Sequence, residues 1–498
     1  MSAAPSLNAE HLDVVIVGAG LSGIGAAYRL QTEHPGRSYA ILEARDSLGG
    51  TWDLFRYPGI RSDSDMFTLG YPFKPWRDAK SIADGPSILR YITETAAENG
   101  IDRHIRFGTK VIAAEWDSTR SHWTLTLEHK TAEGVAHSSL TANFLYACSG
   151  YYDYDRGHAP EFPGLEDFAG QVVHPQFWPE NLDYAGKKVV VIGSGATAVT
   201  LVPAMAADAE LVTMLQRSPT WISAVPGRDK LADRIRETLP PKLAHRVIRT
   251  KNILFNVGFY QYCRRRPEAA RKMLLGLTTR ILKDRELVAE HFTPDYDPWD
   301  QRLCAVPDAD FFKAMRKGRA QVVTDHIETF VPEGIRLKSG RVLEADVVIT
   351  ATGLQLLAFG GITLTVDGAP VRLSDQFVWQ GTMLTGVPNF AVCIGYTNAS
   401  WTLRADLTSR LVCRVLRYMD RNGYSAVVPQ PDRDLAQRPL LELASGYIQR
   451  SIGEFPRQGD RQPWTVRQNY LLDSATTMRR GLSRTLRPVR AAKTLQRV

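Results

Sequence analysis

The sequence is poor in cysteine and has no long apolar run. Its 498 residues include five cysteines, and none lies within four residues of another. This spacing argues against a C-x-x-C motif, a zinc ribbon or a disulfide framework, and favours a reducing compartment. No run of about 18 apolar residues is present, and the N-terminus lacks the pattern of a secretory signal. We therefore expect a cytoplasmic protein with no metal site.

Repeats of 20–50 residues and long low-complexity tracts are also missing. Hydrophobic residues make up 44% of the chain and charged residues 23%, which are globular proportions. At roughly 150 residues per domain, the length predicts about three domains or lobes.

The charge is unevenly distributed. The formal net charge of the chain is +8. Residues 222–290 contain 16 Lys/Arg and 7 Asp/Glu, a net charge of +9. Residues 474–498 contain 7 Lys/Arg and no Asp/Glu, a net charge of +7. The remaining residues therefore carry a net charge of −8. Because no zinc finger, RRM or helix-turn-helix pattern accompanies the basic residues, we expect no nucleic-acid partner. The basic tail intersperses Leu482, Leu486 and Val489; it predicts either an interfacial helix on anionic lipid or a solvated end.

A dinucleotide-binding pattern opens the chain. A β-branched run at residues 13–17 is followed at once by Gly18-Ala-Gly20-Leu-Ser-Gly23, a helical pattern, and a second apolar run at 39–42 that ends at Glu43. Glycines in this turn let the backbone approach a pyrophosphate, and the helix N-terminus offers amides to it. Glu43 suits a free ribose 2′-hydroxyl, as in FAD.

The same pattern recurs in the middle of the chain. An apolar run at 188–192 leads into Gly193-Ser194-Gly195-Ala196-Thr197-Ala198, a helix and a strand at 211–215, followed by Arg217 and Ser218. Arg217 lies 24 positions after Gly193, and Glu43 lies 25 after Gly18. An arginine beside a hydroxyl at this place suits the 2′-phosphate of NADPH. The alternative is that Arg217 is an ordinary surface residue at a strand end, without a role in binding.

These patterns predict an α/β fold with two Rossmann-like dinucleotide-binding domains. Strand ends at 147–150 and 349–353 indicate changes of domain, so the NADPH domain is predicted to be inserted into the FAD domain. We expect a first FAD part at 8–152, the NADPH domain at 153–384 with a helical excursion at about 222–300, a second FAD part at 385–473 and a basic tail at 474–498. Two dinucleotide sites imply hydride transfer between cofactors. Without a close cysteine pair for disulfide reduction, oxygen or another small acceptor remains.

Two further strings resemble a known family. Residues 168–179 read FAGQVVHPQFWP and match F-x-G-x-x-x-H-x-x-x-W-P, while residues 49–63 read GGTWDLFRYPGIRSD and match G-G-x-W-x-x-x-x-Y-P-G-x-x-x-D. Both patterns are typical of type I Baeyer–Villiger flavin monooxygenases. Segments 52–71, 297–312 and 395–403 are similar to the mycobacterial ethionamide-activating branch. The resemblance extends from residue 13 to about 470.

The resemblance implies a reaction and a set of site residues. NADPH would reduce FAD, O2 would form a C4a-peroxyflavin, and this species would convert a ketone to an ester, with sulfides or thioamides as further substrates. Arg302 aligns with the family's catalytic arginine and Asp63 with the acid that orients it. The implied FAD set is Gly18, Gly20, Ser22, Gly23, Glu43, Gly50, Thr51, Trp52 and Asp63, and the NADPH set is Gly193, Ser194, Gly195, Ala196, Thr197, Arg217 and Ser218. His174 and Trp178 are supporting residues of the motif.

One position departs from the family pattern. Many members place a lysine before the catalytic arginine to assist the NADPH phosphate, and here the residue is Gln301, so Arg217 and Ser218 would select NADPH. The alternatives are a flavin monooxygenase acting mainly on sulfur or nitrogen and a non-catalytic FAD/NADPH-binding redox protein. The sequence leaves the substrate and the oligomeric state open.

Overall fold

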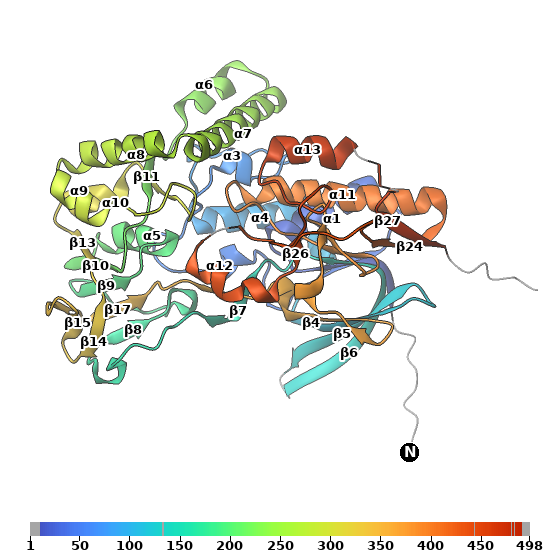
Figure 1. Cartoon of the computed structure of the whole chain (residues 1–498), viewed down its shortest axis with the longest axis horizontal. Helices are drawn as coiled ribbons and strands as arrows, with labels where there is room; N and C mark the ends of the chain where they lie inside the picture. The colour runs from blue at the N-terminus through green and yellow to red at the C-terminus, as the bar shows by residue number, and fades with distance from the viewer. Residues whose placement is uncertain (1–9, 132–133, 443, 480, 483, 491–498) are drawn as a thin grey trace, which may run out of the picture.

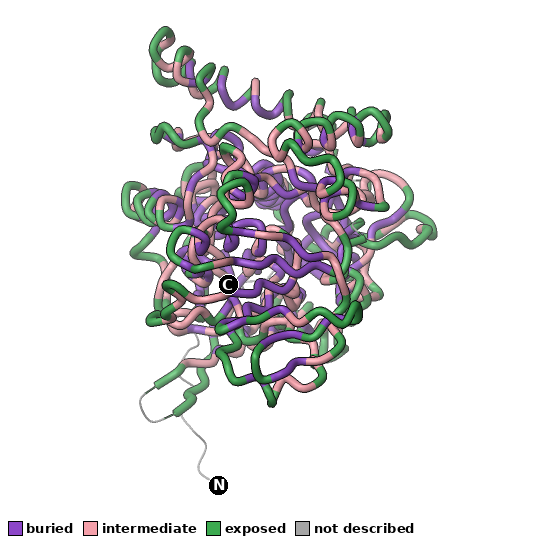
Figure 2. Tube along the Cα trace, turned by 90° about the vertical axis from the view of Figure 1, so that its left-hand side faces the viewer, coloured by how far each residue is buried: buried purple, intermediate pink, exposed green. Residues whose placement is uncertain are grey.

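The computed structural model describes residues 10–131, 134–442, 444–479, 481–482 and 484–490. Two α/β layers lie side by side, each built around a sheet with a parallel centre, and a group of helices covers one outer side (Figure 1). Burial is concentrated in the central strands (Figure 2). No described helix is long and apolar enough to cross a membrane.

The first sheet has 11 strands. Its main path runs β20-β19-β4-β5-β6-β1-β2-β3, and β23, β22 and β21 extend it from β6. The bounds are β1 His11–Val17, β2 Tyr39–Leu42, β3 Ile105–Arg106, β4 Thr109–Asp117, β5 His122–Thr131, β6 Gly134–Ala147, β19 Thr363–Val366, β20 Ala369–Pro370, β21 Val378–Trp379, β22 Met383–Leu384 and β23 Phe390–Val392. Strands β3, β2, β1, β6 and β23 are mutually parallel neighbours.

Helices cover the parallel part of this sheet. Strand β1 is buried on both faces, as expected for a central parallel strand. Helix α1 packs along α11, and both contribute to one apolar core with the side chains of β1. The helices of this half are α1 Leu21–Glu33, α2 Thr51–Leu54, α3 Met66–Leu69, α4 Gly85–Glu98, α11 Trp401–Asn422, α12 Gly446–Ser451 and α13 Tyr470–Arg479.

The second sheet has five parallel strands in the order β13-β10-β9-β17-β8. Their bounds are β8 Gln171–Val173, β9 Lys188–Ile192, β10 Leu211–Gln216, β13 Ala320–Thr324 and β17 Val347–Thr350. Helices α5 Ala196–Met205, α9 Arg285–His291 and α10 Asp310–Arg316 share a core with one face. The antiparallel strands β14 Ile327–Val331, β15 Gly334–Leu337 and β16 Val342–Glu344 share the core of the other.

A two-stranded ribbon joins the two sheets. Strand β7 Tyr152–Gly157 leaves the first sheet after β6, and β18 Leu354–Leu356 returns from the second after β17; the two pair antiparallel. Every strand of the five-stranded sheet therefore lies between β7 and β18 in the chain. The predicted changes of domain at 147–150 and 349–353 lie at the two ends of this ribbon.

Three predictions require correction. The chain rejoins the first sheet before residue 385, because β19 pairs with β4 and β21 and β22 also belong to this sheet. These strands are two to four residues long, too short for a periodic pattern. The excursion begins with a strand, β11 Ile222–Val225, paired with β12 Cys304–Pro307, before α6 Lys230–Thr238, α7 Pro241–Arg265 and α8 Pro267–Leu282.

The third correction concerns the tail. Strand β27 Leu486–Arg490 pairs with β24 Tyr424–Pro429, and Leu482 and Leu486 are buried in the core of the first sheet. The predicted interfacial helix is wrong for this part, because leucines already packed in the protein cannot insert into lipid; residues 491–498 lie outside the described part. The remaining strands of this region are β25 Arg438–Pro439 and β26 Arg457–Gln458.

Candidate active site

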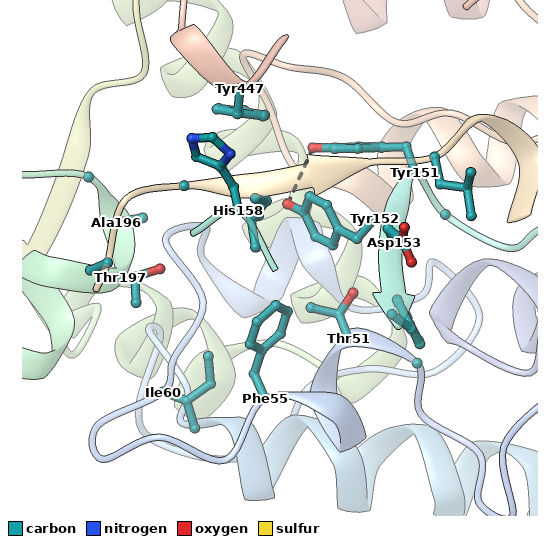
Figure 3. Close-up of a pocket in the computed structure, with 18 of the residues that line it drawn as sticks. Thr51, Phe55, Ile60, Tyr151, Tyr152, Asp153, His158, Ala196, Thr197 and Tyr447 are labelled. Carbon is teal, nitrogen blue, oxygen red and sulfur yellow. Dashed lines mark hydrogen bonds between the residues drawn. The ribbon is translucent and has the colours of Figure 1, made fainter. Parts of the chain in front are cut away.

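A cavity of about 1680 Å³ lies between the two sheets and receives both glycine turns. Thr51, Phe55 and Ile60 project from one side, Ala196 and Thr197 from the second unit, and Tyr447 and His158 from above (Figure 3). The carboxyl ends of both parallel sheets face this space, which is where open α/β sheets bind their ligands. Among the described residues, no group of His, Cys, Asp or Glu could hold a metal ion.

The first turn is shaped for close approach to a ligand. Gly18 has φ +98°, and a Cβ there would lie 2.9 Å from the carbonyl oxygen of Cys148. A Cβ on Gly23 would lie 1.8 Å from the Gly18 oxygen. Helix α1 begins after Gly20 with no side-chain cap, so its first amides point into the cavity region unpartnered by a side chain. Gly23 does not line the cavity; it packs the helix against the turn rather than contacting a ligand.

Glu43 is held rigidly at the end of β2. One carboxylate oxygen accepts from the Ala19 amide at 2.7 Å and the other from the Arg45 amide at 3.0 Å. Burial raises the pKa of this carboxyl above its usual value, against the lowering effect of those two amides. The side chain is 6% exposed and lines the cavity, so its remaining lone pairs face the space where a ribose would lie.

The G-G-x-W segment forms the floor of the cavity next to this turn. Gly50, Thr51 and Trp52 line it, as does Ser22. The Ser22 hydroxyl accepts from the Trp401 indole at 2.7 Å. The segment is fixed from behind by Asp53, which accepts from Arg45 and from Ser47, both at 2.5 Å.

The second turn is equally tight at its first glycine and more open at its second. Gly193 has φ +124°, and a Cβ there would lie 2.3 Å from the Ala351 oxygen, whereas a Cβ on Gly195 would meet nothing within 4 Å. The Ser194 and Thr220 hydroxyls hydrogen-bond at 2.6 Å. Gly193 to Thr197 all line the cavity.

Arg217 and Ser218 are exposed at the end of β10 and line the same cavity. Within the described part of the chain, no carboxylate lies within ion-pair distance of Arg217, so its charge is available to a ligand. His326 and Lys338, from the turn before β14 and the end of β15, line the cavity as well. Sequence reasoning missed both, since no local motif marks them.

Arg302 and Asp63 meet in this cavity. The Arg302 Nε lies 3.4 Å from the Asp63 Oδ2, and each side chain is 33% exposed. Asp63 raises the pKa of Arg302 well above its ordinary value, so the guanidinium is a permanent cation. The loop that carries Arg302 is fixed by an ion pair of Asp300 with Arg264 at 2.5 Å.

Tyrosines form the wall around this ion pair. Tyr151 and Tyr152 hydrogen-bond through their hydroxyls at 3.4 Å (Figure 3), and both line the cavity with Tyr447. Burial raises the pKa of Tyr152 to about 12, and raises those of Tyr151 and Tyr447 as well. All three are therefore neutral near pH 7. Their sequence positions had not marked them as site residues.

His174 and Trp178 do not line the cavity. The His174 ring packs beneath the connecting ribbon, where a Cβ on Gly157 would lie 2.2 Å from its Cε1, and burial lowers its pKa. Gln176 donates to the carbonyls of Asp153 and Tyr154 in β7. Trp178 packs against the core of the second sheet. This motif therefore fastens the ribbon to the second sheet.

The expectation of no close cysteine pair also needs correction. Cys148 and Cys393 follow the paired strands β6 and β23, and the two thiols lie close enough for Cys148 to lower the pKa of Cys393. Residues 245 positions apart could be brought together only by the fold. Both are free and buried.

Comparison with known proteins agrees with these features. Residues 66–230 match a model described as flavin-binding monooxygenase-like, and residues 16–79 match an NAD(P)-binding Rossmann-like domain. Among solved structures, a steroid monooxygenase bound to NADP has a TM-score of 0.70 at 24% identity over 85% of this chain and 88% of that one. An open cyclohexanone monooxygenase has a TM-score of 0.69 at 21% identity, over 85% of this chain and 90% of that one. These likenesses establish the fold.

Relatives in sequence are much closer. The FAD-containing monooxygenase EthA of Mycobacterium tuberculosis is 55% identical over 474 residues, covering 95% of this chain and 96% of that protein. EthA of Mycolicibacterium smegmatis is 54% identical over 466 residues, covering 93% and 94%. With this identity over nearly the whole length, and with two nucleotide-type turns facing one cavity, the chain belongs to the family of FAD-containing monooxygenases that includes EthA.

Proposed function

We propose that the protein is a Baeyer–Villiger monooxygenase in which the first unit holds FAD and the inserted second unit holds NADPH. The FAD unit would consist of residues 10 to about 152 and of residues from about 357 onward. The NADPH unit would contain the strands from β8 to β17. The first turn fits a dinucleotide, because it has no room for a Cβ at Gly18 or Gly23 and presents uncapped helix amides suited to a pyrophosphate. Glu43 at the end of β2 favours FAD, because an acid there suits a free ribose hydroxyl.

The second turn fits NADPH in a different way. Ser194, Gly195 and Thr197 line an open approach, and Arg217 supplies an unpaired cation where a 2′-phosphate would lie. Arg217 would hold the phosphate through charge-assisted hydrogen bonds, and Ser218 would donate a further one. Lys338 provides a second cation on the same side, which compensates for Gln301.

Bound FAD, reduced with hydride from NADPH, supplies the activation of O2 that this chemistry needs. Arg302 supplies a fixed positive charge in the cavity. When the carbonyl carbon of a ketone is attacked, negative charge develops on its oxygen, and a preorganised cation stabilises that charge. Asp63 orients the guanidinium, and it leaves further N–H groups free to donate.

The tyrosine wall serves a second requirement, the exclusion of water. The rings of Tyr151, Tyr152 and Tyr447 line the cavity with the ion pair, and their hydroxyls stay protonated near pH 7. A site poor in water strengthens the interaction of Arg302 with a developing anion and protects reactive species from hydrolysis.

The observation that carries the proposal is the Arg302–Asp63 ion pair in the cavity shared by both turns. The test is product analysis with the FAD-loaded enzyme, NADPH and a mixture of a simple ketone and a sulfide under ¹⁸O₂. We expect an ester containing one ¹⁸O atom, with sulfoxide as a second product. Sulfoxide without ester would favour the alternative, a monooxygenase of sulfur or nitrogen. NADPH consumption without an oxygenated product would favour a redox protein.

A further inference from the structure

Exposed apolar side chains are concentrated on the helical excursion. Of the 15 large hydrophobic residues that are exposed in the described part of the chain, eight lie on α6, α7 and α8. These helices lie on the outer side of the molecule, away from β4, β5 and β6 (Figure 1). The concentration matters because scattered exposed leucines are ordinary, whereas a contiguous patch marks an interaction surface.

Helix α7 carries the centre of this surface, which we call the α7 stripe: Leu243, Val247, Leu254, Phe255 and Tyr262. Their exposed fractions run from 38% to 67%, with Phe255 the highest. Spacings of four, seven and eight residues from Leu243 through Val247 and Leu254 to Tyr262 place these side chains on one helix face. The opposite face, with Ile248, Arg249 and Ile253, is buried.

Basic side chains flank the α7 stripe. Lys242 and Arg246 are exposed beside Leu243 and Val247, and Arg265 and Arg266 are exposed at the end of the helix. Within the described residues, none of these four has a carboxylate within ion-pair distance, unlike Lys251 and Arg264 of the same helix. Acidic side chains of the described residues therefore do not neutralise these four charges.

We propose that the α7 stripe docks on the surface of an anionic lipid bilayer. An apolar helix face bordered by lysine and arginine is the arrangement that lies at a membrane interface, with the apolar side chains among the acyl chains and the cations at the headgroups. A second copy of the chain is a poorer occupant, because residues 222–290 have a net charge of +9 and would face the same charge. The α7 stripe replaces the C-terminal tail as the membrane contact.

The docked helix is firmly connected to the active site. From its buried face Arg249 donates to the carbonyls of Phe67 and Gly70, each at 2.8 Å. Asn256 donates to Asp65 at 3.1 Å, two residues from Asp63. The docking surface is therefore tied by hydrogen bonds to the segment that carries Asp63.

The test is co-flotation of the full-length, FAD-loaded protein with phosphatidylcholine vesicles, with and without phosphatidylglycerol. Two variants probe the two components: Leu254→Ser/Phe255→Ser for the apolar face and Lys242→Glu/Arg246→Glu for the charge. The matched controls are Phe107→Ser, an exposed aromatic on the far sheet, and Arg336→Glu/Arg433→Glu, two exposed arginines elsewhere. Flavin absorbance and NADPH oxidation report that each variant is folded.

We expect the wild type and both controls to float with anionic vesicles and not with neutral ones. Each α7 variant should lower the bound fraction at least tenfold, since one cation near an anionic surface contributes about fivefold in partitioning. Negligible flotation of the wild type, or flotation unchanged in both α7 variants, would overturn the proposal. So would loss, in the same variants, of a self-association measured by sedimentation without vesicles, since a second copy would then be the occupant.

Discussion

The two glycine turns follow the same backbone path and differ in what surrounds them. The amide of Gly18 donates to the oxygen of Leu42 and that of Gly193 to the oxygen of Leu215, both at 2.8 Å. Gly20 and Gly195, the N-cap residues of the helices that follow, have φ/ψ of −77°/−172° and −78°/−173°. The backbone therefore supplies the same amides to a phosphate in each unit.

The contrast lies at the end of the next strand. Glu43 is 6% exposed and both its oxygens accept backbone amides, whereas Arg217 is exposed and has no described acidic partner. A resident cofactor suits a buried, pre-ordered acceptor, while a cosubstrate that leaves after each turnover suits an exposed cation. Under the proposed assignment, the same turn would serve two nucleotides, and one residue beyond it would select between them.

The first prediction concerns a substitution that should disrupt the glycine turn of the first unit and has no counterpart in the second. The residue equivalent to Gly23 in the second unit is Ala198, yet a Cβ on Gly23 would lie 1.8 Å from the Gly18 oxygen. We expect Gly23→Ala to displace the turn, to cost more than about 3 kcal/mol of stability and to yield protein without FAD. Flavin absorbance and thermal unfolding measure this. The matched change Ala198→Gly should cost only about 1 kcal/mol and keep FAD; equal losses would show that the two turns are packed alike.

The second prediction removes the selecting cation. Arg217→Ala should lower kcat/KM for NADPH by roughly 10- to 100-fold, because a hydrogen bond to a charged group contributes about 1.5–3 kcal/mol. The value for NADH should hardly change. Steady-state kinetics with both nucleotides measure the ratio, with Arg336→Ala, an exposed arginine outside the cavity, as control. A wild-type ratio near one would contradict the assignment of this unit to NADPH.

The third prediction concerns the acid of the first unit. Glu43→Gln should weaken FAD binding about tenfold near pH 7 by the same argument. Burial raises the pKa of Glu43, so lowering the pH towards it protonates the carboxyl and removes an acceptor. Wild-type affinity should therefore fall as the pH falls, while that of Glu43→Gln stays flat over the same range. Fluorescence titration of the apoprotein with FAD measures both; parallel pH profiles would exclude Glu43 as the group responsible.

The sequence predicted the repeated units closely because their signals are local. The strand at 39–42 coincides with β2 and that at 188–192 with β9, since β-branched runs next to glycine turns have few alternatives. The return to the first sheet at β19 was placed too late, because its strands are short and are defined by pairing rather than by pattern. Strand β27 was missed for the same reason.

The site was predictable where a motif marked it. The family resemblance implied the pairing of Arg302 with Asp63, 239 residues apart in the chain, and they lie at ion-pair distance. Tyr447, His158 and Lys338 reach the cavity from segments with no recognisable spacing, so only the fold could show them. The Cys148–Cys393 contact is likewise a product of strand order.

The most direct test of the account is the Arg302→Ala variant, with both half-reactions measured in one preparation. If each glycine unit binds its own nucleotide and Arg302 acts on the substrate, stopped-flow flavin reduction by NADPH should stay near the wild-type rate. Ester formation should fall by at least about 10²-fold, the cost of removing a preorganised group that stabilises developing charge. Arg302→Lys keeps the positive charge but loses the planar guanidinium with its several N–H donors. Its rate of ester formation should lie between those of the wild type and Arg302→Ala. Ester formation by Arg302→Ala at the wild-type rate would contradict the central claim.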